Sequence, residues 1–220
     1  MQKIILWGTG EMTQIIEYYI NKEQAFDVVA YTMDREYIKD KTYNSKPIVP
    51  FDEIEKHYSP KEFKLGIPMS SKKLNKIREE KYLEGKSKGY SFITYISKNA
   101  VCDAETIGEN NFIFPGCVIQ PFSKIGNNIV MWPHTHIGHH TEIKDNCFLA
   151  IPKISGHCTI EKNCFLGINC SLADHITIGE YSIIGGGAIV TKNVKQNSVL
   201  AEKQTPKLEM TSFDLEGLIQ

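Results

Sequence analysis

The stretch ISGHCTIEKNCFLGINCSL, residues 154–172, carries an aliphatic residue at every sixth position, beginning with Ile154. The same period runs through most of the second half of the chain, with one residue missing between Leu149 and Ile154. Aliphatic residues and Met make up roughly a quarter to a third of an average chain, so chance does not explain the series. All sixteen of its positions are aliphatic or Met: Val101, Ile107, Ile113, Ile119, Ile125, Met131, Ile137, Ile143, Leu149, Ile154, Ile160, Leu166, Leu172, Ile178, Ile184 and Val190.

This six-residue period predicts a left-handed parallel β-helix over residues 101–195. Each unit forms one flat face, and three units, about 18 residues together, make one coil. Successive coils stack at about 4.8 Å. The first residue of each unit is expected to fill the axis, and the next residue to turn the corner. We therefore expect positive φ at the glycines that follow the aliphatic residue, because glycine adopts it without strain: Gly108, Gly126, Gly138, Gly167, Gly179 and Gly185.

The cysteines follow the same repeat. The fifth position of each unit also points inward but has less room, which favours small side chains. Buried thiols acting as small apolar fillers explain this usage, so we expect no nucleophilic cysteine. No C-x-x-C pair and no signal-like segment is present, which favours reduced thiols and gives no support to a cysteine zinc site. Five of the six cysteines occupy this column: Cys117, Cys147, Cys158, Cys164 and Cys170.

The first hundred residues have a different pattern. Apolar runs at 3–7, 26–31, 63–67 and 91–96 read as strands, and helical patterns follow Gly10 and cover 51–57 and 70–84. This alternation predicts a small parallel α/β sheet. The expected domains are therefore 1–97 for the sheet and 98–200 for the β-helix, followed by a C-terminal tail, 201–220.

A ligand site is expected at the carboxyl ends of these strands, where ligands of open α/β sheets lie. Gly8-Thr9-Gly10 opens a helix whose backbone amides could face an anion, but Thr13 stands where a dinucleotide fingerprint has its third glycine. A sugar nucleotide, a dinucleotide and a purely structural turn remain alternatives. The residues nominated for substrate binding are Gly8, Gly10, Thr32, Asp34 and the 66–70 loop with Pro68.

Histidines gather in the central coils. His140, His157 and His175 occupy the fourth position of successive coils, and His139 a third position. A histidine there titrates in the range suited to accepting a proton near neutral pH, and we favour His139 as general base. Most of the other histidines are interpreted as surface or interface residues without a chemical role. A metal site of His134, His136, His139 and His140 is the weaker alternative, so no metal is predicted.

The bulk composition excludes some partners. Lys+Arg is 25 and Asp+Glu is 26, so no charge excess favours nucleic acid or a membrane surface. The hydrophobic fraction of 41% is ordinary for a globular protein, and no apolar run approaches ~18–20 residues. A cytoplasmic protein is expected.

The whole chain resembles the bacterial sugar acetyltransferases that include the bacillosamine, perosamine and sialic-acid enzymes. The most specific segments are Ile160–Asn169 (IEKNCFLGIN) and Ile184–Ala188 (IGGGA). The resemblance implies an α/β, Rossmann-like N-terminal domain that holds a nucleotide sugar, before the all-β left-handed β-helix. It also implies a homotrimer that binds acetyl-CoA between adjacent β-helices.

The resemblance further implies site residues and shows departures. The catalytic histidine of the family maps to His139, with His140 beside it, and the coenzyme-lining positions map to Gly156, Ile168 and Gly186, to which we add His157. Relatives usually have an acidic residue where His140 stands, so either Glu142 or another group orients His139, or the pair works differently. A second histidine of some relatives is Phe148, and the usual C-terminal element appears only as EKQTP, residues 202–206.

The expected reaction is acetyl-CoA-dependent N-acetylation of a nucleotide-linked aminosugar for glycan synthesis. His139 would remove the proton of the attacking amine, and the amide of Gly156 would hold the oxyanion. The alternatives are O-acetylation of a sugar or sialic acid, a catalytically silent scaffold, and a zinc-dependent β-helix like that of the γ-carbonic anhydrases. The sugar, the nucleotide and the acyl chain length are left open.

Overall fold

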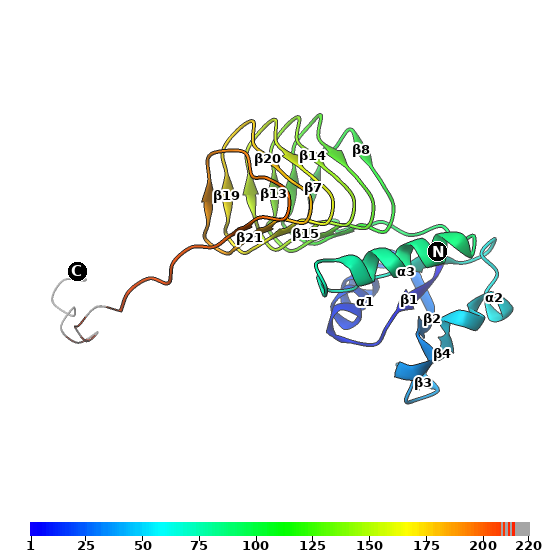
Figure 1. The fold of residues 1–220 in the computed structure, drawn as a ribbon. Helices are drawn as coiled ribbons and strands as arrows, with labels where there is room; N and C mark the ends of the chain where they lie inside the picture. The colour runs from blue at the N-terminus through cyan, green and yellow to red at the C-terminus, as the bar shows by residue number, and fades with distance from the viewer. Residues whose placement is uncertain (208, 210, 212, 214–220) are drawn as a thin grey trace.

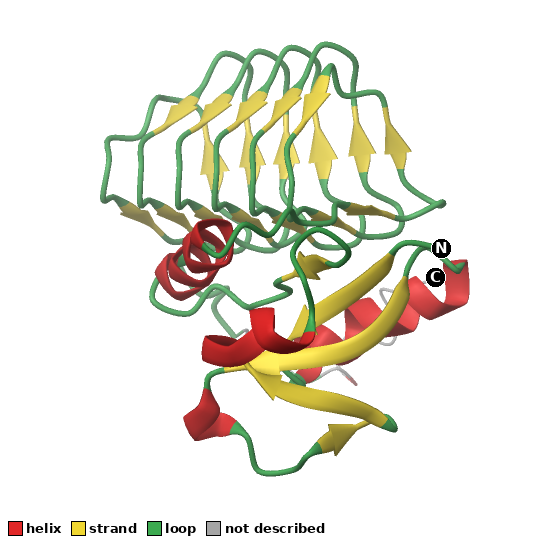
Figure 2. Ribbon diagram, turned by 90° about the vertical axis from the view of Figure 1, so that its right-hand side faces the viewer, coloured by secondary structure: helices red, strands yellow, loops and turns green. Residues whose placement is uncertain are grey.

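The computed structural model describes residues 1–207, 209, 211 and 213. It has two parts, a small α/β sheet and a long three-sided β-helix that follows it (Figure 1). Figure 2 shows the coils of the β-helix side by side, with the sheet and its helices on one side of them. The expected tail, 201–220, lies partly outside the described residues. Among the residues described, no helix is long and apolar enough to cross a membrane.

The N-terminal sheet has the strand order β3-β4-β2-β1-β5. Strands β1 (Lys3–Trp7), β2 (Asp27–Met33), β4 (Lys46–Pro50) and β5 (Lys64–Gly66) are parallel, and the short β3 (Thr42–Tyr43) is antiparallel to β4. The helices are α1 (Glu11–Glu23), α2 (Ile54–His57) and α3 (Lys76–Ser87), with short 3-10 turns at Arg35–Tyr37 and Phe51–Glu53. The expected β-α-β alternation is confirmed for β1, α1 and β2.

Two expectations for this part hold only in part. Of the run 91–96, Phe92 joins the N-terminal sheet through an isolated parallel bridge to Leu65 of β5. Only β6 (Tyr95–Ile96) is a strand there, and it pairs with the first coil of the β-helix. The helix expected from residue 70 begins only at Lys76, because residues 73–75 all have left-handed φ, between 49° and 65°, which an α-helix excludes.

The β-helix has three parallel sheets, which we call its first, second and third faces. The first face contains β7 (Val101–Cys102), β10 (Val118–Ile119), β13 (His136–Ile137), β16 (Lys153–Ile154), β19 (Ser171–Leu172) and β22 (Ile189–Val190). The second contains β8 (Thr106–Ile107), β11 (Lys124–Ile125), β14 (Glu142–Ile143), β17 (Thr159–Ile160) and β20 (Thr177–Ile178). The third contains β6, β9 (Phe112–Ile113), β12 (Val130–Met131), β15 (Phe148–Leu149), β18 (Phe165–Leu166), β21 (Ile183–Ile184) and β23 (Val199–Leu200).

The aliphatic series fills the axis as expected, with one exception. Residues from Ile113 to Val190 in the series form one buried core, with Ile107 partly buried at its start. The register also confirms the missing residue, because Ile137 pairs with Ile154. The exception is Val101, which is 55% exposed. Its neighbour Cys102 pairs with Ile119 and packs on the core instead, because the unit before Ile107 is one residue short.

The cysteine column is buried as predicted. All five of its thiols are at most 1% exposed, and every cysteine in the chain is free. Burial raises the pKa of Cys117 to about 11 and that of Cys170 to about 12, so these thiols stay protonated at neutral pH. They are therefore poor nucleophiles, as the repeat predicted.

The corners do not use glycine as expected. Positive φ recurs at the fourth position of the units, and the residues that adopt it are mostly Asn and His, the types that tolerate left-handed backbone. The glycines after the aliphatic residues have a different function, because the next coil passes too close for a side chain. A Cβ on Gly167 would lie 2.6 Å from the Gly186 nitrogen, and one on Gly179 would lie 2.8 Å from Cα of Gln196.

We predict that Gly179→Ala destabilises the protein by about 1–3 kcal/mol, the usual cost of overpacking, because its Cβ meets backbone that cannot move aside. Gly187→Asn is the control. Gly187 has φ +73°, which Asn tolerates, and no atom lies within 4 Å of its added Cβ. Urea unfolding measures both variants, and equal stabilities would contradict the close-approach explanation.

The N-terminal part docks on the third face. Ile16 and Ile20 of α1 share a buried cluster with Phe112, Phe114 and Val130 of the first coils. At the neighbouring corner, side-chain amides form a ladder in which Asn110 donates to Asn128 and Asn128 to Asn146, both at 2.7 Å. The carboxylate of Glu79 in α3 accepts from Asn146 and Asn163, each at 2.9 Å.

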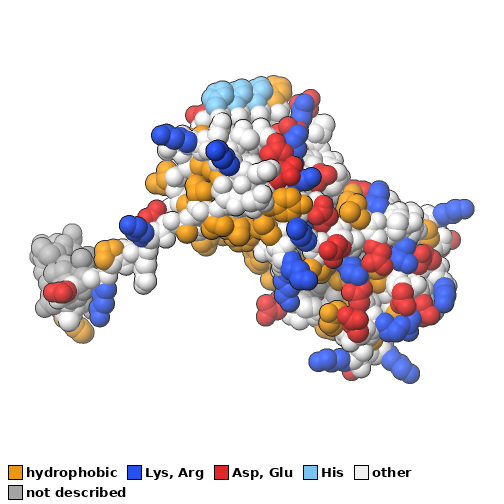
Figure 3. Space-filling view, viewed as in Figure 1, with side chains coloured by type: hydrophobic (Ala, Val, Ile, Leu, Met, Phe, Trp, Pro, Cys, Tyr) orange, Lys and Arg blue, Asp and Glu red, His pale blue; other side chains and the backbone are white. Residues whose placement is uncertain are grey.

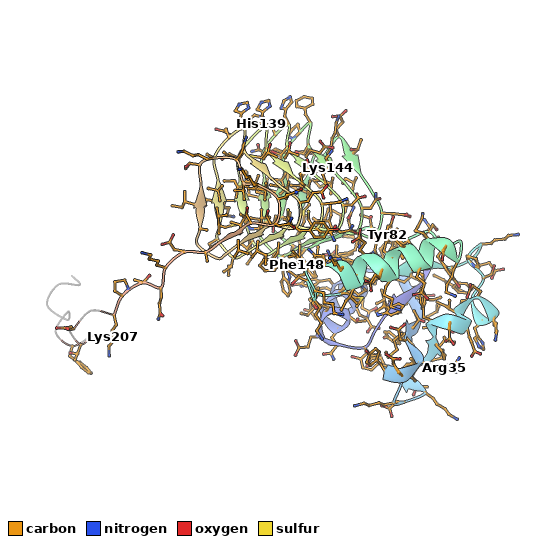
Figure 4. All side chains as sticks on the ribbon, viewed as in Figure 1. Arg35, Tyr82, His139, Lys144, Phe148 and Lys207 are labelled. Atoms are coloured by element: carbon orange, nitrogen blue, oxygen red, sulfur yellow. The ribbon has the colours of Figure 1, made fainter. Side chains whose placement is uncertain are left out.

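The most deeply buried cation of this junction is Arg78 of α3, which is 0% exposed. Its guanidinium donates to the carbonyls of Met69 at 3.2 Å and of Asn146 and Cys147 at 3.0 Å. It also lies 5.8 Å from the ring of Phe148. The expected equivalent of a second family histidine, Phe148, is therefore a packing residue of the junction. Figure 4 shows it on the side of the β-helix that faces the N-terminal part.

Candidate active site

Four histidines gather along one corner of the β-helix, where the first face turns into the second. His139 and His140 lie between β13 and β14, His157 lies between β16 and β17, and His175 between β19 and β20. Figure 3 shows histidine side chains gathered at the edge of the β-helix that points away from the N-terminal part, and Figure 4 labels His139 there. All four side chains are exposed. We call these four residues the histidine corner.

The backbone sets the stacking at this corner. His140, His157 and His175 have left-handed φ of 57°, 55° and 60°, so each turns the chain at the same place on its coil. Their rings stack on one another, with centroids 4.7 Å and 4.6 Å apart. The exposed ring of Phe122 continues the stack, 4.7 Å from His140. The expected placement of the three histidines on successive coils is confirmed.

His139 lies across this stack. Its ring is nearly perpendicular to the rings of His140 and His157, at 88° and 86°. Its backbone N–H donates to Oε1 of Gln120 at 2.9 Å. A Cβ on Gly156 would lie 2.7 Å from Cε1 of His139, so the absence of a side chain at Gly156 makes room for the ring.

The partner of the His139 ring is His140. The two Nδ1 atoms lie 3.1 Å apart, so one of them donates and the other accepts. When His139 is the donor, its Nε2 carries the free lone pair that a general base needs. The other sequence alternative, Glu142, pairs with Lys144 on the second face instead.

The neighbouring imidazoles act on His157. Desolvation and then the adjacent rings of His175 and His140 lower the pKa of His157 below its usual value. A proton on one ring of the stack disfavours a second proton on the next, because like charges repel at these separations. His157 therefore favours its neutral form, which is the form that can accept a proton.

The amide of Gly156 is engaged, contrary to the expectation that it waits for an oxyanion. Its N–H donates to Oδ1 of Asp174 on the next coil, at 2.8 Å. Asp174 is exposed, so its carboxylate reaches the amide from outside the coil. An anionic oxygen thus occupies the place that the sequence analysis gave to the reacting group.

The expected coenzyme-lining residues lie at two different corners. Gly156 and His157 lie where the first face turns into the second, whereas Ile168 and Gly186 lie where the third face turns into the first. Ile168 is 56% exposed, and a Cβ on Gly186 would lie 3.0 Å from its Cγ2. The first face separates the two pairs, so one chain alone does not bring the four residues together.

The expected substrate residues of the N-terminal part are only partly together. Gly8, Gly10 and Pro68 line a hollow of about 400 Å³ with Lys72 and Trp7 beside them. Gly8 has φ +79°, and Gly10 has open space around its Cα, so backbone lines part of this hollow.

Thr32 and Asp34 are engaged elsewhere. The buried Thr32 hydroxyl donates to the Val49 carbonyl at 2.8 Å, so it belongs to the sheet. Asp34 pairs with Lys81 of α3 at 2.6 Å. Neither side chain lines the hollow, and strand-end position alone could not reveal these partners.

The histidines that lie close together are not the four named for the alternative metal site. His134 lies at the other end of the first face, and His136 faces Gln120 and the Ile154 carbonyl on strand β13. The group whose ligand atoms all lie within 4.8 Å of one another is His139, His140 and His157. The coil repeat predicted that His140 and His157 stack. Because His139 directly precedes His140, the same repeat could also have indicated that these three histidines lie close together.

Comparison with known proteins supports the repeat and the fold. The family model described as bacterial transferase hexapeptide (six repeats) matches residues 106–139 and 157–192. The acyl-[acyl-carrier-protein]–UDP-N-acetylglucosamine O-acyltransferase of Nautilia profundicola is 29% identical over 120 residues, 51% of this chain and 45% of that protein. The UDP-3-O-acylglucosamine N-acyltransferase of Campylobacter lari is 30% identical over 84 residues, 38% of this chain and 24% of that protein. The chain thus spans less than half the length of these curated relatives.

Solved structures match over nearly the whole chain. The acetyltransferase domain of PglB from Neisseria gonorrhoeae, in complex with acetyl coenzyme A, has a TM-score of 0.81 and 16% identity, covering 91% of this chain and 96% of that one. A mutant perosamine N-acetyltransferase from Caulobacter crescentus, in complex with CoA and GDP-perosamine, has a TM-score of 0.80 and 17% identity, covering 92% and 94%. WeeI from Acinetobacter baumannii reaches 0.78 with 21% identity, covering 94% and 100%. These findings confirm the resemblance at the level of the repeat and of the whole fold.

Proposed function

We propose that this hexapeptide-repeat protein transfers the acetyl group of acetyl-CoA to the amine of a nucleotide-linked aminosugar. The observation that carries the proposal is His139, an exposed imidazole whose Nδ1 faces His140 at 3.1 Å, so that Nε2 is left for the substrate. Structures with the same fold hold acetyl coenzyme A, or CoA with GDP-perosamine. The relatives by sequence are acyltransferases of UDP-linked glucosamine derivatives.

In this proposal His139 acts as general base and general acid in one transfer. Nε2 takes the proton of the attacking amine while the nitrogen bonds to the thioester carbonyl carbon. The C–S bond then breaks, and the same proton leaves with the CoA thiolate. No acyl-enzyme is needed because the thioester is already activated, and the buried cysteines are out of reach of a substrate.

His140 takes the part that an acidic neighbour has in the relatives. As the acceptor from Nδ1–H of His139, it holds the ring and keeps the reactive tautomer. A neutral imidazole accepts only one such bond and carries no charge, so it stabilises a protonated His139 less than a carboxylate does. The pair therefore acts chiefly by orientation.

In this mechanism the amide N–H of Gly156 binds the oxyanion. In the structure this N–H donates to the exposed carboxylate of Asp174, so the amide binds the oxyanion only once that contact is released. The thioester oxygen would displace this exposed carboxylate as negative charge develops. One such donor is typically worth about 3–4 kcal/mol of barrier.

The coenzyme is proposed to lie between copies of the chain in a homotrimer. Gly156 and His157 lie at one edge of the first face and Ile168 and Gly186 at the other, so two neighbouring copies would supply the two walls. The histidine corner also points away from the N-terminal part of its own chain (Figure 3). A sugar held by a neighbouring copy would therefore reach His139 more readily than one held by the same copy.

The nucleotide is assigned to the N-terminal domain, residues 1–97, which we propose to be Rossmann-like. Its hollow at Gly8, Gly10 and Pro68 lies at the start of α1 and contains Lys72, which suits a phosphate group. Thr32 and Asp34 would shape this domain through their bonds to Val49 and Lys81 rather than contact the ligand.

Incubation of the full chain with acetyl-CoA and a panel of GDP- and UDP-linked aminosugars tests the proposal. We expect free CoA to appear only with an amine acceptor, together with a product heavier by one acetyl group that resists mild base. A base-labile product would indicate O-acetylation instead. Thermal-shift titration with acetyl-CoA is the companion measurement, and the absence of both stabilisation and turnover would favour a scaffold.

A further inference from the structure

Three imidazoles of the histidine corner converge on one point. His139, His140 and His157 each offer a ring nitrogen, and these nitrogens lie within 4.8 Å of one another. The two Nδ1 atoms of His139 and His140 are already 3.1 Å apart. Ligand nitrogens at about 2.0–2.1 Å from a Zn²⁺ ion lie roughly 3.4 Å apart in a tetrahedral site. Imidazole lone pairs lie in the ring plane, so the stacked rings of His140 and His157, whose planes differ by 15°, have to turn toward a common point to bind such an ion.

The scaffold holds the three residues in place. His140 and His157 turn the same corner on adjacent coils, and the His157 N–H donates to the His139 carbonyl at 2.9 Å. The main chains are therefore joined, and only side-chain torsions remain free. Because all three rings are exposed, turning them costs little and an ion can enter from solvent.

The donor set selects the class of ion. Three neutral imidazoles without a carboxylate suit Zn²⁺, Co²⁺, Ni²⁺ or Cu²⁺, and they disfavour Mg²⁺ and Ca²⁺, which prefer oxygen ligands. Three histidines would also leave a fourth position open to water.

We propose that His139, His140 and His157 form a binding site for one borderline transition-metal cation, such as Zn²⁺, and that its occupation blocks acetyl transfer. The second half of this statement rests on the proposed function. A metal bound to His139 draws the ring into coordination and breaks its contact with His140, so the base no longer faces the substrate.

Titration of the full chain with Zn²⁺ alone by calorimetry, and with Co²⁺ by visible absorption, tests the binding. His157→Asn is the main variant, because Asn163 adopts the same left-handed φ at the equivalent position of the next unit, so we expect the backbone to accept Asn at this position. His175→Asn is the matched control, since it makes the same substitution one coil further on, outside the cluster. We expect one Zn²⁺ per chain, affinity lowered at least about tenfold in His157→Asn, and little change in His175→Asn.

Two results would overturn the site. One is equal Zn²⁺ affinity in the wild type and His157→Asn. The other is Zn²⁺ binding that falls equally in both variants, which would indicate diffuse surface imidazoles. Acetyl transfer is measured separately with and without Zn²⁺ and a chelator. Binding without any acetyl transfer would refute the proposed function and leave the site standing, whereas transfer that is insensitive to bound Zn²⁺ would refute only the block.

Discussion

Replacing His139 by Ala is expected to lower turnover by about two to four orders of magnitude while acetyl-CoA still binds. The loss equals the usual contribution of a positioned general base. We expect binding to be retained because two of the four residues assigned to the coenzyme, Ile168 and Gly186, lie at another corner, away from this ring. Steady-state kinetics give the turnover, and calorimetry with acetyl-CoA gives the binding.

His175→Asn is the control for that experiment. It removes an imidazole from the same corner, and Asn tolerates its left-handed φ of 60°. The ring of His175 stacks on His157 rather than on His139. Turnover near the wild-type value is expected. Unchanged turnover in His139→Ala would remove the base from the proposed mechanism, and an equal loss in both variants would mean that the corner acts only structurally.

Arg78→Ala is expected to be the most destabilising single change in the junction, at roughly 3–5 kcal/mol. The fully buried guanidinium donates to three carbonyls. Its loss leaves those of Met69 and Asn146 without this donor beside a cavity, whereas Cys147 keeps its bond from the Val130 N–H. Burial lowers the pKa of Arg78 to about 10, so the cation is still protonated at neutral pH. Chemical unfolding followed by circular dichroism measures the change.

Arg35→Ala provides the comparison. This arginine pairs with Asp52 and Glu53 on the surface, where its side chain is 56% exposed, and surface pairs contribute little. No measurable change in stability is expected. If Arg78→Ala proved as stable as Arg35→Ala, the docking of α3 on the β-helix would not depend on the buried cation.

The β-helix was readable from sequence because a solenoid converts spacing along the chain directly into stacking. Each unit pairs with the units one coil before and after, so the period placed Ile137 beside Ile154 and His140 beneath His157. The prediction failed at Val101, where a shorter first coil shifts the register by one residue and a strand's side chains change face. Strand β4 was missed because Pro47 and Pro50 interrupt its apolar pattern.

The residue types of the candidate site could be predicted from the sequence, but the hydrogen-bond partners of those residues could not. The sequence placed His139 at the corner and left open which group orients it. The answer, His140 rather than Glu142, depends on side-chain directions, since Glu142 turns to Lys144 on the second face. The engagement of Gly156 by Asp174 depends likewise on how two coils overlap at one corner.

The sequence by itself determined the three-sided solenoid, its buried cysteine column and the histidines on its successive coils, because each of these follows from a local period. The tertiary structure decided why glycine follows the aliphatic residues, how the N-terminal part docks through Arg78, and that the residues expected to line the coenzyme lie at two corners. These features arise from contacts between segments far apart in the chain. No short-range pattern records such contacts, since they depend on which backbones approach closely and which polar groups lose their water.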